Sequence, residues 1–183
     1  MKKVRLDNRP IGPFPAMIVG ATRNTKPTYT TVGAGGCVCL DPVLCVSLKN
    51  NHYITDGIAQ SGCFSVNIPS CDLIKEMDYC GIISGWDVDK SGMFKPFFDV
   101  AGNAPMIEEC PLNFLCKVFD SKEICGFTMF FGNIVATYVN DDCLSENQPD
   151  PLKINPIIMM AVNYCNLKGV IGRPFSDGKK LMK

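Results

Sequence analysis

The sequence has only one histidine and one tryptophan in 183 residues, and its 18 basic side chains balance its 18 acidic ones. A single histidine, His52, argues against histidine-rich metal sites. A Ser-His-Asp or Cys-His catalytic site would have to use this histidine, and the sequence suggests no partner residue for it. The zero net charge gives no reason to expect a nucleic acid or an anionic membrane as partner, and it does not oppose self-association.

Long apolar runs are also missing. No stretch reaches the ~20 apolar residues of a membrane span, and the first ten residues, MKKVRLDNRP, lack the apolar core of a signal peptide. We therefore expect no membrane contact and a cytoplasmic location. The length, a hydrophobic content of 46% and a charged content of 20% are typical of a globular protein. We expect residues 1–183 to form one domain.

Cysteine is abundant, but its spacing predicts neither a metal site nor a disulfide framework. The eleven cysteines are an odd number, they are scattered, and they include no C-x-x-C pair. Five cysteines lie in apolar stretches and are expected to pack as small hydrophobic side chains: Cys45, Cys63, Cys116, Cys125 and Cys165. We expect Cys80 to be buried as well, with a thiol close to a bound ligand as the alternative.

Many short apolar runs between turn residues predict a mostly antiparallel β-barrel with a few short helices. Strands are predicted at residues 15–21, 28–32, 44–48, 64–68, 113–119, 127–139 and 162–165. Helices are predicted at 55–61, capped by Thr55 and Asp56, at 72–83, capped by Ser70, and at 154–161. Residues 84–111 are expected to be irregular, with Phe94, Phe97 and Phe98 covering the core or a dimer partner.

The region from residue 28 to residue 69 carries the main functional signal. Thr30 and Thr31 offer hydroxyl groups, and the glycine-rich turn at 33–36 leaves room for a flat ring against bare backbone. The polar loop 47–53 follows a buried strand and precedes a helix N-terminus, and such a combination of donors, a cation and a helix end suits a phosphate. We interpret these features as a flavin phosphate site.

Two other interpretations of the same residues remain open. The glycines fit an ordinary turn at a strand end, and Lys49 and His52 fit a solvated loop. A dinucleotide-binding fingerprint is not supported, because the third glycine and the βαβ unit are missing.

Motifs along most of the chain resemble the flavin reductase-like family, with its flavoredoxin branch closest. They include Thr31–Cys39, Val46-Ser47-Leu48, Phe64–Pro69, Asp87-Val88-Asp89-Lys90 and Gly172-Arg173-x-Phe175. The resemblance implies an FMN-binding split barrel that forms a homodimer, with one FMN per subunit near the interface. It places the flavin ring along residues 30–34, the phosphate at the polar loop, and Lys90 near the flavin. The cofactor-binding residues expected on this basis are Thr30, Thr31, Val32, Gly33, Ala34, Ser47, Leu48, Lys49, Asn51, His52, Tyr53 and Lys90.

Three positions depart from the family pattern. Ile54 stands where the family often has threonine, which removes one hydroxyl from the phosphate loop. In the pattern Gly-x-His-x-x-x-x-Gly-Glu, Phe127 replaces the histidine and Asn133 replaces the glutamate. The last two changes bear on hydride uptake from NADH or NADPH more than on FMN binding, unless Phe127 is simply a residue of the barrel core.

We therefore expect a flavoprotein that passes electrons through bound FMN, with a redox protein as a further partner. The alternatives are an NAD(P)H-dependent flavin reductase that uses FMN as an exchangeable substrate, and a flavin-binding protein without redox function. The redox chemistry belongs to the cofactor, so no catalytic residue is named.

Overall fold

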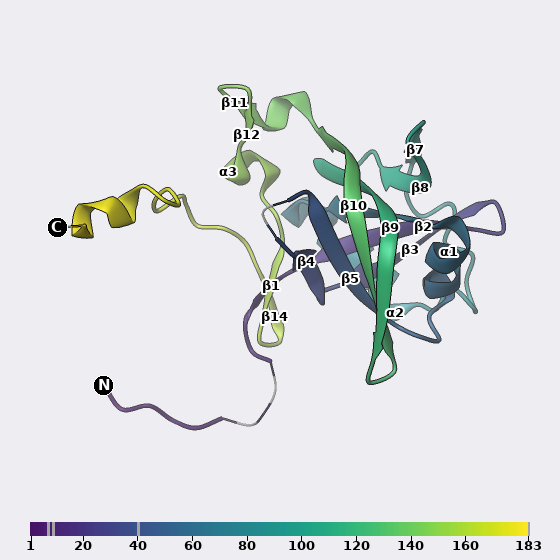
Figure 1. Cartoon of the computed structure of the whole chain (residues 1–183), viewed down its shortest axis with the longest axis horizontal. Helices are drawn as coiled ribbons and strands as arrows, with labels where there is room; N and C mark the ends of the chain where they lie inside the picture. The colour runs from purple at the N-terminus through teal and green to yellow at the C-terminus, as the bar shows by residue number, and fades with distance from the viewer. Residues whose placement is uncertain (7, 9, 40, 183) are drawn as a thin grey trace.

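A seven-stranded antiparallel sheet forms the body of the molecule and curls into a half-barrel (Figure 1). The structure is a computed structural model that describes residues 1–6, 8, 10–39 and 41–182. In spatial order the strands are β3 (Lys26–Val32), β2 (Met17–Arg23), β6 (Cys63–Ile68), β9 (Leu112–Ile124), β10 (Phe127–Val139), β5 (Val43–Lys49) and β4 (Gly35–Cys37). The predicted mostly-β, antiparallel split barrel is confirmed.

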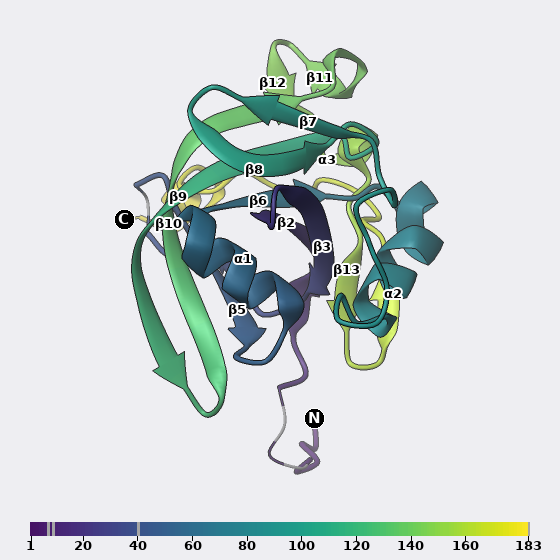
Figure 2. The same cartoon turned by 90° about the vertical axis from the view of Figure 1, so that its right-hand side faces the viewer.

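Short helices and small strand pairs surround this sheet. Helix α1 (Tyr53–Ser61) lies across the mouth of the curled sheet, and α2 (Ile74–Ile82) lies outside β3 (Figure 2). The other strands and the third α-helix are β1 (Pro13–Pro15), β7 (Pro96–Asp99), β8 (Gly102–Ile107), β11 (Leu144–Ser145), β12 (Gln148–Pro149), α3 (Pro151–Ile154), β13 (Ile158–Met160) and β14 (Asn163–Cys165). Short 3-10 helices lie at Cys71–Leu73, Asp141–Cys143 and Asp177–Leu181. In the described part of the chain, no helix has the length and apolarity needed to cross a membrane.

Strand β2 is continuously apolar and buried from Met17 to Ala21, where both of its faces are covered. Met17, Val19 and Ala21 point into the half-barrel, where they pack with α1 residues such as Ile58. Ile18 points to the other face and joins a second cluster beneath α2. Successive side chains of a strand face opposite ways, so a strand that is buried on both sides needs an unbroken apolar run.

Asn67 joins several strands at the centre of the fold. Its amide nitrogen donates to the Ile18 carbonyl at 2.9 Å and to the Ser65 hydroxyl at 3.0 Å. Its amide oxygen accepts from the Ile107 N–H at 3.0 Å and from Asn113 Nδ2 at 2.9 Å. The side chain is fully buried, and all four of its hydrogen-bonding positions are used.

Two predicted secondary-structure assignments are wrong, each for an identifiable reason. The helix predicted at 154–161 lies earlier, at Pro151–Ile154, because Asp150 caps it and Asn155 ends it with a left-handed φ of 48°. The proline at 156 also disfavours a helical Asn155. The segment 84–111 is only partly irregular, since β7 and β8 pair within it. Of its phenylalanines, Phe94 is buried and Phe98 is exposed.

The predicted burial of the cysteines is confirmed for some residues and wrong for others. Cys63, Cys80 and Cys116 are buried, and burial raises the pKa of the Cys80 thiol to about 11. Cys125 and Cys165 are exposed, and Cys45 is half-buried. Cys125 and Gly126 form the two-residue turn between β9 and β10, with φ of 51° and 80°, and two positive φ angles are typical of hairpin turns. The apolar stretch around Cys125 is therefore interrupted by a tight surface turn.

We predict that Asn67→Ala lowers the free energy of unfolding by about 3 kcal/mol, because buried donors and acceptors on four strands lose a partner. Urea denaturation followed by circular dichroism measures the loss. Asn103→Ala removes an exposed side chain and serves as the control, with an expected change within about 0.5 kcal/mol. A loss below 1 kcal/mol for Asn67→Ala would mean that this network contributes little to stability.

Candidate functional site

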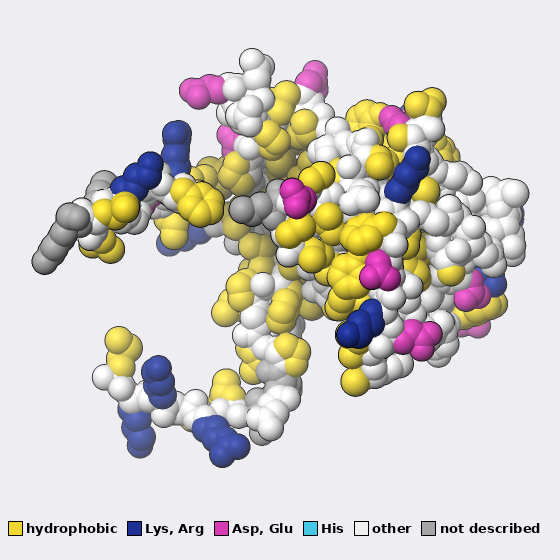
Figure 3. All heavy atoms as spheres, in the orientation of Figure 1, with side chains coloured by type: hydrophobic (Ala, Val, Ile, Leu, Met, Phe, Trp, Pro, Cys, Tyr) yellow, Lys and Arg dark blue, Asp and Glu magenta, His cyan; other side chains and the backbone are white. Residues whose placement is uncertain are grey.

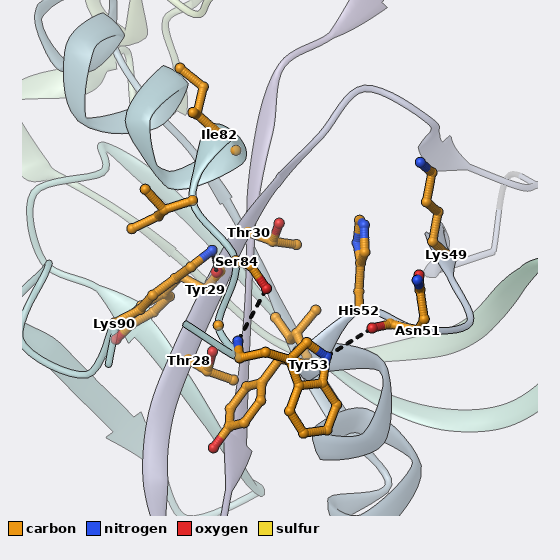
Figure 4. A pocket seen from close by; sticks show the side chains of 15 residues that line it. Thr28, Tyr29, Thr30, Lys49, Asn51, His52, Tyr53, Ile82, Ser84 and Lys90 are labelled. Carbon is orange, nitrogen blue, oxygen red and sulfur yellow. Dashed lines mark hydrogen bonds between the residues drawn. The ribbon is translucent and has the colours of Figure 1, made fainter. Parts of the chain in front are cut away.

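A cavity of about 250 Å³ lies where the end of β5, the start of α1, β3 and the segment after α2 meet (Figure 4). It is lined by Thr28, Tyr29, Thr30, Lys49, Asn51, His52, Tyr53, Ile54, Gly81, Ile82, Ile83, Ser84, Gly85, Trp86 and Lys90. These lining residues include two lysines and no aspartate or glutamate. The cavity therefore favours an anionic ligand.

The carbonyl of Lys49 holds the turn from β5 into α1 through two hydrogen bonds. This carbonyl accepts the His52 N–H at 3.0 Å and the Thr55 hydroxyl at 2.9 Å. Helix α1 consequently begins at Tyr53 with His52 at the N-cap, and the predicted capping by Thr55 and Asp56 is wrong. The positive end of the helix dipole lies at the cavity wall, where it stabilises a negative charge.

His52 has a polar atom that the folded chain does not satisfy. Its Nδ1 is buried and has no hydrogen-bond partner among the described residues. Burial lowers the pKa of the imidazole, and the positive charges of Lys49 and Lys90 lower it further. Because a buried polar atom without a partner is costly, this nitrogen is a natural contact for a polar ligand in the cavity.

Lys90 lies at the other end of the cavity and is 4% exposed. Its Nζ donates to the carbonyl of Cys80 at 2.8 Å and to the carbonyl of Tyr29 at 3.1 Å. The neighbouring Asp89 faces outward and pairs with Lys26 at 2.9 Å. Asp89 therefore lies in a surface turn, whereas the side chain of Lys90 is buried.

One wall of the cavity consists of Tyr53 and Trp86, whose rings meet edge to face at a centroid distance of 5.1 Å. Trp86 Nε1 donates to the carbonyl of Asn51 at 2.9 Å. The Arg23 guanidinium lies 4.0 Å from the ring centroid of Tyr53 and 4.6 Å from that of Trp86, and it pairs with Asp56. A second cavity of about 270 Å³ shares Tyr53 and Trp86 in its lining and is also lined by Lys26 and Asp89.

Half of the predicted site residues line the first cavity: Thr30, Lys49, Asn51, His52, Tyr53 and Lys90. The other half do not, namely Thr31, Val32, Gly33, Ala34, Ser47 and Leu48. The Thr31 hydroxyl donates to the carbonyl of Met77, and Val32 and Leu48 are buried in the core. The Ser47 N–H donates to the Ala34 carbonyl at 2.8 Å.

The glycine-rich stretch is not the open turn that was expected, because Gly35–Cys37 forms the edge strand β4 against β5. A Cβ atom on Gly35 would lie 2.5 Å from the Cys45 carbonyl oxygen. At this position glycine permits the close approach of two strands, and sequence alone could not separate this role from a ring platform.

Sequence reasoning placed no ligand contact at Gly81–Trp86, although these residues form a large part of the lining. The signal that could have identified them is the single tryptophan next to a glycine. Gly85 packs so closely on Tyr53 that a Cβ atom would lie 2.8 Å from the Tyr53 Cβ.

We predict that the lone histidine titrates below its usual pKa of about 6.5, because burial is the main cause of its shift. The ¹H NMR signal of His52 Hε1, followed against pH, measures this value. Lys49→Met should raise the His52 pKa, since it removes a nearby positive charge. A midpoint at or above 6.5 would contradict the burial of the imidazole.

The same shift has a consequence for stability. The unfolded chain takes up the proton first as the pH falls, because its histidine has the higher pKa. His52 should therefore reduce stability progressively below about pH 6.5, and the loss should be complete once the pH is below the pKa of the folded form. Urea unfolding of the protein and of His52→Gln across this range isolates the contribution.

Comparisons with known proteins agree with this architecture. The model of the flavin reductase like domain matches residues 12–168. The crystal structure of flavoredoxin from Methanosarcina acetivorans is 34% identical, with a TM-score of 0.93 over 100% of both chains. Flavoredoxin of Desulfovibrio vulgaris (Miyazaki F) is 31% identical, with a TM-score of 0.89 over 97% of this chain and 100% of that one.

Among curated proteins, an uncharacterized protein of Archaeoglobus fulgidus is 28% identical over 112 residues, which are 59% of this chain. The chain spans 62% of the length of that relative. The resemblance seen in the sequence motifs is confirmed, including its flavoredoxin branch. The chain belongs to the flavin reductase-like family.

Proposed function

We propose that this protein binds FMN in the cavity at the start of α1 and passes electrons through it, within a single domain formed by residues 1–183. The observation that carries the proposal is the cavity itself, which holds two lysines, no acidic lining residue and the unpartnered Nδ1 of His52. The flavoredoxin names of the two related structures support the same cofactor class.

The residues present fit a flavin mononucleotide. Lys49, Asn51, His52 and the N-terminus of α1 offer a cation, an amide, an imidazole and a helix dipole to the phosphate. Thr30 and Lys90 line the part of the cavity that is left for the ring. Among the residues that line this cavity, the anion-binding groups gather at the start of α1, which fits the single phosphate of a mononucleotide better than the two of FAD. When bound, the flavin supplies the redox chemistry, and the protein supplies binding, orientation and electrostatics.

We predict that the purified protein is yellow and that Lys49→Ala weakens FMN binding by one to two powers of ten. A charge-assisted contact to phosphate is worth roughly 1.5–3 kcal/mol, and added salt should weaken binding further. Quenching of FMN fluorescence gives the dissociation constants. Lys95→Ala, an exposed lysine paired with Glu108, is the matched control and should bind as the wild type does. Colourless protein that does not quench FMN would refute the proposal.

An electron carrier fits the residues better than an NAD(P)H-dependent reductase. Phe127 lies on β10 directly opposite Lys49 on β5, and residues opposite each other in antiparallel strands share a face of the sheet. Its side chain is 37% exposed, so the alternative that Phe127 is a core residue is wrong. A phenylalanine at the edge of the site cannot hydrogen-bond an incoming nicotinamide cofactor.

We predict slow, weakly saturable oxidation of NADH and NADPH by the FMN-loaded protein. Phe127→His should raise kcat/KM several-fold, since one positioning hydrogen bond is worth about 0.5–1.5 kcal/mol. FMN affinity and melting temperature should stay nearly unchanged, because the position is on the surface. Anaerobic stopped-flow reduction of both variants provides the rates. Fast reduction of the unmutated protein by NADH would instead support the flavin reductase function.

The protein partners are proposed as a second copy of the chain and a redox protein that exchanges electrons with the flavin. Phe119 and Phe131 pack together on the outer side of the β9–β10 pair, with Phe119 56% exposed. The terminal segments project from the body with apolar side chains uncovered, among them Ile171 and Phe175 (Figures 1 and 3). Exposed apolar surface of this kind marks interaction sites. The cytoplasmic location also remains a prediction.

We predict that the protein sediments as a dimer of the 20.1 kDa chain at micromolar concentration. Phe119→Lys should shift the equilibrium toward the monomer, because a charge placed in an apolar contact is costly. Val100→Lys, at a fully exposed position, is the control. If the wild-type protein sediments as a monomer, the proposed homodimer is refuted.

A further inference from the structure

Lys90 is a buried cation without an acidic partner. The ion pairs found in the described part of the chain are Arg23–Asp56, Lys26–Asp89 and Lys95–Glu108. Asp89, the sequence neighbour of Lys90, uses its carboxylate on Lys26 and on the Ser91 N–H. A buried charge without a counter-charge is unfavourable, so an anionic ligand in the cavity would complete this part of the fold.

The groups around Lys90 do not neutralise it. An ammonium has three N–H donors, and two are used on the carbonyls of Tyr29 and Cys80. One donor is left for a ligand. Burial raises the pKa of the Cys80 thiol to about 11, and it lowers the pKa of His52. Neither shift places a negative charge beside Lys90, and burial lowers the pKa of Lys90 itself, so an anionic ligand would favour its charged form.

The cavity has two cationic ends. Lys49 projects from the end of β5, whereas Lys90 reaches in from the segment after α2. Figure 4 shows the two lysines on opposite sides, with Thr30 and His52 between them. A phosphate bound by Lys49, Asn51 and His52 leaves Lys90 to face a different part of the same ligand.

We propose, on the basis of the FMN-binding function, that Lys90 stabilises the negative charge that the flavin ring gains on reduction and so raises its midpoint potential. The ring takes two electrons from a redox protein donor and one proton from solvent, and therefore gains one negative charge. A cation held in a poorly hydrated wall interacts with that charge more strongly than one in water. The oxidised ring carries no such charge, so Lys90 favours the reduced form selectively.

Lys49 has a different role, although it is also a cation in this cavity. The charge of a phosphate does not change when the ring is reduced. Lys49 should therefore strengthen the binding of oxidised and reduced FMN alike. This difference makes Lys49 the matched control for Lys90.

The experiment is an anaerobic spectroelectrochemical titration at saturating FMN of the wild type, Lys90→Gln, Lys90→Met and Lys49→Met. In both Lys90 variants, the ratio of the affinities for reduced and oxidised FMN should fall about tenfold. This corresponds to a fall of about 30 mV in the midpoint potential of a two-electron couple. Lys49→Met should lower the affinity for both forms and shift the midpoint potential much less than the Lys90 variants do, because Lys49 lies at the phosphate end of the cavity. Lys90→Gln keeps amide donors for the two carbonyls, so a fall seen in Lys90→Met alone would show a structural effect and overturn the proposal.

The wild type gives a second readout that needs no variant. The slope of its midpoint potential against pH gives the number of protons taken up per two electrons. We expect one proton at pH 7, and an uptake of two protons would contradict the role of Lys90. Lys90 variants that bind FMN with an unchanged potential would likewise overturn this inference and leave FMN binding intact. A wild type that binds no FMN would instead refute the proposed function, and this inference with it.

Discussion

The carbonyl of Lys49 organises the site, because two groups from the next turn of chain close onto it. The His52 N–H and the Thr55 hydroxyl both donate to this oxygen, which turns a strand into a helix within three residues. The consequence is that the last side chain of β5 and the N-cap of α1 face the same cavity. A longer connection would place the lysine and the helix end apart, and neither alone would make a phosphate site.

The position of α1 depends in turn on the two-sided packing of β2. Ile54 and Ile58 anchor the helix among side chains such as Val19 inside the half-barrel. The cluster on the opposite face holds Met77 and Cys80 of α2, and the segment that delivers Lys90 follows that helix. The two walls of the cavity are thus fixed by the two faces of one central strand, and the Asn67 network holds that strand to its neighbours.

The sequence predicted the elements whose signals are local. Turn residues and alternating apolar patterns located the main strands, and β10 was predicted with its observed bounds of Phe127–Val139. The polar loop at 47–53 was also sufficient to find one end of the cavity. The family resemblance placed Lys90 at the site, whereas the approach of Trp86 was not predicted, because it depends on the path of the chain after α2. The role of Gly35 was not predictable either, because the glycine is required by the close approach of the β5 backbone in the neighbouring strand.

Trp86 and Tyr53 line both cavities. A displacement of the indole would therefore change the lining of both cavities. Its tether to the carbonyl of Asn51 passes the same displacement to the loop between β5 and α1. A ligand that moved the indole from the second cavity would thus also act on the loop that lines the first.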